Sequence, residues 1–99
     1  MALLKDLDEF DRIGKIGDWC FVNGETHIAI QLGENKFINS CVLPILKKGD
    51  AREITGVYWD WNGDKNSPTL TPSILHWGYG RHKPSTWHGY MTDGKLIEC

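Results

Sequence analysis

The chain has 99 residues, of which 40% are hydrophobic and 24% are charged, and its formal net charge is −2 at pH 7. This length suits one domain with a modest core, and the composition excludes intrinsic disorder, so we expect residues 1–99 to form a single domain. The slight acidity argues against direct nucleic-acid binding, which needs an excess of Lys and Arg. Five Trp, three Tyr and three Phe indicate an aromatic core or recognition surface.

The N-terminus becomes charged after two leucines, from Met1 to Asp6, which is unlike a signal peptide. No apolar run approaches the ~20 residues that span a bilayer. We therefore expect a cytoplasmic protein of a bacterial host cell, with no membrane contact. The three Cys are then expected to be reduced thiols or metal ligands.

An N-terminal segment, residues 1–16, carries an apolar stripe. Its large apolar residues recur at spacings of three and four, which predicts a short amphipathic helix: Leu3, Leu4, Leu7, Phe10 and Ile13. Gly14 and Gly17 interrupt the pattern. We expect this helix to pack on a sheet, with a partner-binding helix as the alternative.

The body, residues 18–99, shows separate strand patterns along its length. They lie at 19–22, 26–32, 37–46, 54–61, 70–77, 87–91 and 95–98. Asn23-Gly24 and Asp93-Gly94 are typical hairpin turns. Pro72 indicates that 70–77 is an edge strand or an irregular segment. We predict a mainly β fold, with α+β as the alternative, in which about six antiparallel strands and one helix form a small sandwich or half-open barrel.

The stretch from Tyr58 to Ser73 is rich in Trp, Pro and turn-forming residues, a composition typical of a family signature. Trp59 and Trp61 share one face of a strand, and Asn62-Gly63 turns the chain. Two prolines then hold a hydroxyl-rich segment extended.

With W-x-W-N-G, P-T-L-T-P-S-I and W-H-G-Y-x-x-D-G, the chain resembles a family of small uncharacterised proteins of tailed phages and prophages. The resemblance implies a phage accessory protein that binds host machinery, including defence systems. Members often carry additional Cys and His, whereas this chain lacks Cys-x-x-Cys. The matching residues are Trp59, Trp61, Asn62, Gly63, Pro68, Thr69, Leu70, Thr71, Pro72, Ser73, Ile74, Trp87, His88, Gly89, Tyr90, Asp93 and Gly94.

A zinc site is the first chemical alternative. Zinc requires four nitrogen or sulfur ligands in a tetrahedron, and the candidates are Cys20, Cys41, His88 and Cys99. Because no close ligand pair is present, we expect no cofactor, with zinc as the alternative. The cysteines would then be small buried apolar residues.

Catalysis is the second chemical alternative. A nucleophile needs a His within reach, which Cys41 with His88 or Ser73 with His76 would provide. Neither pair sits in a recognisable nucleophile setting. The candidate carboxylates for glycoside cleavage, Asp60, Asp64 and Asp93, lie in or beside turns. We therefore predict no enzymatic activity and no catalytic residues.

The predicted binding surface combines the segment 76–88, which carries aromatic and basic residues, with the acidic N-terminal segment. We expect it to bind a host protein and to inhibit a bacterial defence system such as CRISPR. The alternatives are a nucleotide-binding sponge, since aromatic faces stack bases, or a zinc-binding module. A homodimer through exposed sheet edges is a further expectation. The binding candidates are Trp77, Tyr79, Arg81, His82, Lys83 and Trp87.

Overall fold

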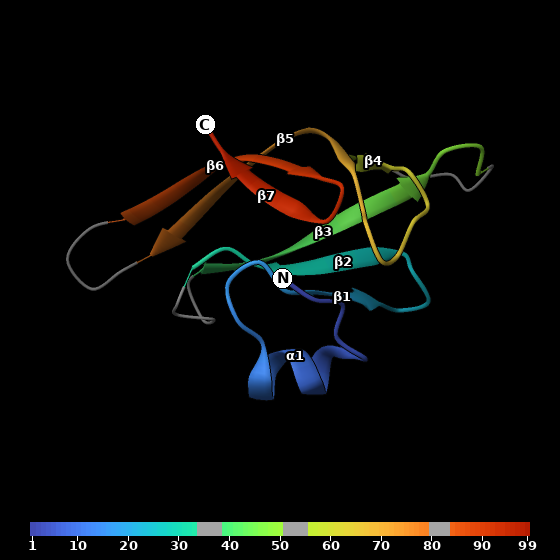
Figure 1. Ribbon diagram of the computed structural model, residues 1–99. Coiled ribbons are helices and arrows are strands. Elements are labelled where there is room, and N and C mark those ends of the chain that lie inside the picture. Colours follow the sequence, from blue (N-terminus) through green and yellow to red (C-terminus); the bar gives the residue numbers. More distant parts are fainter. Residues whose placement is uncertain (34–38, 51–55, 80–83) are drawn as a thin grey trace.

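The computed structural model describes residues 1–33, 39–50, 56–79 and 84–99, the side chains of 77–79 and 84–86 excepted. Within these ranges the chain forms one helix and seven strands (Figure 1). In chain order they are α1 (Leu7–Ile13), β1 (Trp19–Val22), β2 (His27–Gln31), β3 (Ser40–Lys47), β4 (Trp59–Trp61), β5 (Leu70–Tyr79), β6 (Pro84–Thr92) and β7 (Lys95–Glu98). The predicted mainly β fold is confirmed.

The strands form one sheet in which spatial order follows chain order from β1 to β7. The sheet is curled into a half-barrel (Figure 1). Every neighbouring pair is antiparallel except β3 and β4, where Ile45 lies opposite Trp59 in a parallel register. The prediction of an antiparallel sheet missed this pair. Parallel neighbours need a crossover between them, and residues 48–58 separate the two strands along the chain.

The concave face of the sheet holds the main core. Inward-facing side chains alternate with outward-facing ones along each strand. Trp19 joins the two ends of the curl, because a Cβ at Gly94, in the turn between β6 and β7, would lie 3.2 Å from its ring. The buried core residues are Trp19, Ile28, Ile30, Leu32, Cys41, Leu43, Ile45, Trp61, Leu70, Ile74 and Met91.

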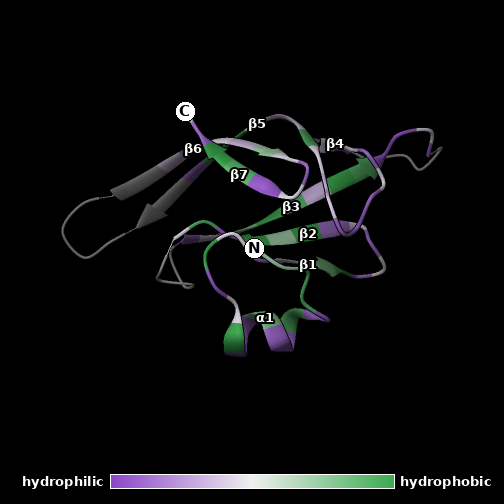
Figure 2. Ribbon diagram, in the orientation of Figure 1, coloured by the Kyte–Doolittle hydropathy of each residue, from purple (hydrophilic) through white to green (hydrophobic). Residues whose placement is uncertain are grey.

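Helix α1 covers the convex face of β1 and β2 (Figure 1). It begins after Asp6, whose side chain accepts a hydrogen bond from the Glu9 N–H at 2.9 Å, an ordinary N-cap. Phe10 is 2% exposed and packs with Leu4, Cys20 and Ala29. The helix bears hydrophobic and hydrophilic residues in turn (Figure 2), and the prediction that it packs on a sheet is confirmed.

Strand β5 lies inside the sheet, between β4 and β6, so the alternative of an edge strand was wrong. The alternative of an irregular segment is confirmed. Between two paired positions β5 advances by four residues, from Leu70 to Ile74, while β6 advances by two, from Met91 to Gly89. Pro72, which has no N–H to give to a ladder, falls inside this irregularity.

No helix in the described part of the chain is long and apolar enough to cross a membrane.

Candidate active site

The site lies on the convex face of β5 and β6. Ile74 and Met91 point inward and are fully buried. Their neighbours in the strands therefore point outward. Ser73, which precedes Ile74, is half-buried, and His88, which lies opposite Leu75, is exposed.

Ser73 and His88 are in direct contact: the His88 Nε2 atom lies 3.2 Å from the Ser73 Oγ atom. The register explains the contact, because regular pairing resumes at Ile74 and Gly89. Ser73 and His88 are then diagonal neighbours on one face, within reach of a long side chain. When Nδ1 carries the imidazole proton, Nε2 accepts the hydrogen bond from the serine hydroxyl.

Strand β4 fixes the backbone of Ser73 from the other side. The indole N–H of Trp59 donates to the Ser73 carbonyl oxygen at 3.2 Å. Trp59 itself packs against the main core. The serine is therefore held between an anchored indole and the imidazole of His88.

The loop before β5 is organised by Asn62. Its Oδ1 atom accepts hydrogen bonds from the N–H groups of Asp64 at 3.2 Å and Thr69 at 3.1 Å, and its Nδ2 atom donates to the Ser67 carbonyl at 3.2 Å. Asp64 accepts from Asn66 N–H at 2.9 Å. These bonds tie the W-x-W-N-G turn to the start of β5.

The far end of the same segment is tied to the turn between β6 and β7. The Thr69 hydroxyl accepts a hydrogen bond from the Asp93 N–H at 3.0 Å, and the Gly94 N–H donates to the Pro68 carbonyl at 2.9 Å. The three parts of the sequence signature thus meet in one network. That network presents Ser73 and His88.

Two different surfaces flank the Ser73–His88 pair. On the β4 side, Asp60 lies opposite Thr71. A cavity of about 500 Å³ opens there, lined by Lys48, Asp60, Trp61, Asn62, Thr69 and Thr71. Around His88, on β5, β6 and β7, three apolar side chains are exposed: Leu75 is 54% exposed, Tyr90 44% and Ile97 52%.

The four candidate zinc ligands are not brought together. Cys20 lies under α1, Cys41 lies in the main core, and His88 lies on the convex face. Cys99 is exposed, and its N–H donates to the His88 carbonyl at 2.9 Å. Among the residues that the structure describes, no group of three His, Cys, Asp or Glu could hold a metal ion.

The two buried thiols also differ from reactive cysteines. Burial raises the pKa of Cys20 from 9.0 to about 11, and the nearby Asp11 and Asp6 carboxylates add to the shift. Burial raises the pKa of Cys41 from 9.0 to about 12. Because the thiolate is the nucleophile, neither thiol is activated.

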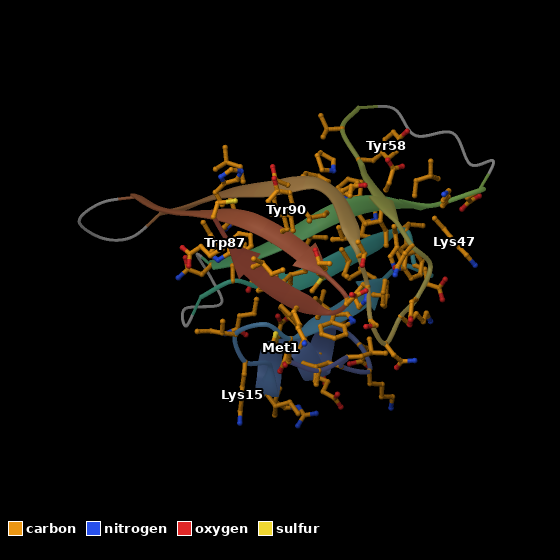
Figure 3. The ribbon with its side chains drawn as sticks, turned by 45° about the horizontal axis from the view of Figure 1, so that its top comes forward. Met1, Lys15, Lys47, Tyr58, Trp87 and Tyr90 are labelled. Atoms are coloured by element: carbon orange, nitrogen blue, oxygen red, sulfur yellow. The ribbon has the colours of Figure 1, made fainter. Side chains whose placement is uncertain are left out.

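Of the predicted binding residues, Trp87 is half-buried and packs against the main core. Trp87 and Tyr90, labelled in Figure 3, are three residues apart on β6 and so project to opposite faces. Trp77 and Tyr79 lie near the end of β5, but their side chains are outside the described part. Arg81, His82 and Lys83 lie outside the described residues altogether.

The part of the chain that holds this arrangement matches a protein family. Residues 39–99 match the family described as bacterial ubiquitination-like system serine protease (BubE). The chain belongs to this family. No curated protein and no solved structure is significantly similar to it. The match includes all of the signature and both Ser73 and His88, and it begins after β2.

The BubE match corrects the functional expectations. The prediction that the chain is not an enzyme was wrong, because the family is named as a serine protease. The prediction of a host-binding inhibitor of CRISPR or another defence system was wrong for the same reason. A small family with this signature is confirmed, but its phage or prophage origin is not shown.

From the sequence, Ser73 was paired with His76 and His88 with Cys41, whereas the structure brings Ser73 and His88 together. Ser73 and His76 are three apart on one strand, so they face opposite sides of the sheet. Cys41 points into the core and His88 points out. The signal that could have found the pair is the hairpin itself: β5 and β6 are consecutive antiparallel strands, which puts residue 73 near residues 88–90.

Proposed function

We propose that the chain is a serine peptidase in which Ser73 is the nucleophile and His88 is the general base and acid. The observation that carries this assignment is the 3.2 Å contact between Ser73 Oγ and His88 Nε2, in a family named as serine proteases. The serines whose side chains the structure describes are Ser40, Ser67 and Ser73. Of these three, Ser73 is the one with a recorded contact to a histidine.

The geometry supports the usual two-step reaction. As the Ser73 oxygen attacks the amide carbon, His88 Nε2 takes the hydroxyl proton. The tetrahedral intermediate collapses when His88 gives that proton to the leaving amine, which departs and leaves an ester on Ser73. Water then attacks the ester with His88 again as base, and the proton returns to Ser73.

The openness of the site favours a protein substrate. His88 is exposed and Ser73 is half-buried on the convex face of the sheet, whereas small-molecule sites enclose most of their ligand. The family name refers to a ubiquitination-like system. In such a system a modifier is joined through its terminal carboxyl group to an amine, so we propose that the chain hydrolyses amide bonds of this kind.

The test is active-site labelling with a fluorophosphonate, followed by peptide mass spectrometry. We expect the label on Ser73, no label in Ser73→Ala, and a labelling rate lowered about a hundredfold or more in His88→Ala, since general base catalysis contributes on that scale. Ser67→Ala is the matched control, because Ser67 contributes its backbone rather than its hydroxyl to the loop. Labelling of Ser40 or Ser85 in place of Ser73 would overturn the assignment.

A further inference from the structure

The surface around His88 is formed by three large apolar side chains, one from each of three adjacent strands. Leu75 of β5 lies directly opposite His88, and Tyr90 of β6 lies directly opposite Ile97 of β7. Residues opposite one another in an antiparallel pair have Cβ atoms about 4.5–5.5 Å apart. Tyr90 lies two residues from His88 on the same face of β6, so Leu75 and Tyr90 lie on either side of His88. With Ile97 beyond Tyr90, these three residues, here called the apolar triad, form a patch around His88.

The core does not account for this patch. The inward positions of the same strands are filled by Ile74, Met91 and Leu96, which pack in the main core. The triad projects the other way and is 44–54% exposed. Single exposed apolar residues are ordinary, but a contiguous patch at a reactive centre marks a surface that another molecule covers.

The chemistry of the Ser73–His88 pair tells which part of a substrate meets the triad. His88 must hand a proton to the leaving amine, so the amine lies on the His88 side of Ser73. Tyr90 and Ile97 lie on that side, on β6 and β7, and Leu75 of β5 lies directly opposite His88. The opposite side of Ser73, toward β4, carries Asp60 and Thr71 on the wall of the cavity there.

We propose that Leu75, Tyr90 and Ile97 form the subsite for the leaving-group side of the scissile bond and select an apolar residue there. This inference rests on the proposed function, because it uses His88 as the proton donor. The occupant is the apolar side chain that carries, or adjoins, the leaving amine. A substrate whose carbonyl carbon reaches Ser73 and whose leaving amine faces His88 extends toward Leu75 and Tyr90, which lie on either side of His88.

The experiment uses the reverse of the first step. An activated nitrophenyl ester of a small acid acylates Ser73, and an added amino-acid amide competes with water for the acyl group. The amine nitrogen attacks the ester carbonyl, His88 takes the amine proton and returns it to the Ser73 oxygen, and the C–O bond breaks as the C–N bond forms. The measured quantity is the ratio of amide product to hydrolysed acid.

We expect leucine amide to capture the acyl group about tenfold better than asparagine amide, a discrimination in the range of small apolar contacts. Ile97→Thr and Leu75→Thr should each remove most of this preference, which is a ratio of two captures of the same acyl group and so does not depend on the rate of acylation. Val42→Thr is the matched control: Val42 is 54% exposed on β3, as Leu75 is on β5, but β4 separates it from the site. It should keep the full preference.

The outcomes are distinct. If the ester does not acylate Ser73, the proposed function fails, and this inference fails with it. If acylation proceeds but the wild-type protein captures both amides equally, the triad is not the leaving-group subsite although the peptidase assignment stands. The wild-type measurement alone separates these two outcomes, so an unstable variant does not obscure the result.

Discussion

The indole nitrogen of Trp59 donates a hydrogen bond to the carbonyl oxygen of Ser73 across 3.2 Å. Trp59 lies on β4 and His88 lies on β6, so Ser73 is held from both neighbouring strands of β5. A residue in an irregular part of a strand has lost ladder partners. Side chains from the two neighbouring strands supply the constraints that the ladder does not.

Trp59→Phe should therefore lower the reactivity of the Ser73 hydroxyl more than it lowers the stability of the fold. The change keeps most of the apolar volume and removes one hydrogen bond, at a cost of about 1–3 kcal/mol for a carbonyl left unpaired. Displacement of the nucleophile should lower the rate of fluorophosphonate labelling about tenfold or more. Trp19→Phe is the control, because the Trp19 indole donates to the Lys65 carbonyl at 3.0 Å, away from Ser73. Equal labelling rates in the two variants would contradict the positioning role.

Asn62→Ala should destabilise the protein strongly. Three hydrogen bonds of its side chain join the turn to β5, so we expect a loss of about 2–3 kcal/mol. In a protein of this size that loss lowers the melting temperature by roughly 8–20 °C. Thermal unfolding measures it. Asn66→Ala is the control, because the recorded hydrogen bond of Asn66 comes from its backbone N–H, and its melting temperature should change little.

Thr69→Val tests the link between β5 and the turn after β6. Valine keeps the shape of the side chain but cannot accept the hydrogen bond that the Asp93 N–H gives to the Thr69 hydroxyl at 3.0 Å. We expect a loss of about 1 kcal/mol in the free energy of unfolding, measured in urea. Thr71→Val, which changes an exposed threonine two residues further along, in β5, should be close to neutral. A similar loss in both variants would mean that strand packing, rather than the link, was measured.

The cysteines should divide sharply in reactivity. Cys20 and Cys41 are buried and Cys99 is exposed. With the pKa of Cys20 raised to about 11 and that of Cys41 to about 12, the folded protein at pH 8 should react with a disulfide reagent at Cys99 alone. All three thiols should react after denaturation. Rapid modification of Cys41 in the folded protein would show that the core opens more easily than its packing indicates.

The same pKa values set the alkaline limit of stability. A raised folded-state pKa means that the folded protein keeps the thiol proton when the unfolded chain would lose it. Stability from this source is complete below the ordinary pKa of 9.0 and is lost as the pH rises toward about 11 for Cys20 and about 12 for Cys41. The free energy of unfolding, measured in urea at pH 8, 9 and 10, should fall across this series. A rise would contradict the burial of the thiols.

Much of the local structure could be predicted because it depends on neighbours in the chain. Asn23 and Gly24 both adopt positive φ in the turn between β1 and β2, as do Asp93 and Gly94 in the last turn, and these residue types tolerate that conformation. The irregularity at Pro72 follows from its missing N–H. The parallel pairing of β3 with β4 could not be predicted in this way, because it depends on where a long connection returns the chain.

The sequence by itself determined the strands, the turns and the signature residues, since periodicity and backbone preference are local properties. It also contained both Ser73 and His88 within that signature. Only the tertiary structure decided that they meet, because the contact depends on the register between two strands and on the two extra residues that β5 accommodates before Ile74. Side chains fifteen positions apart become neighbours through hydrogen bonding across the sheet, which no local pattern encodes.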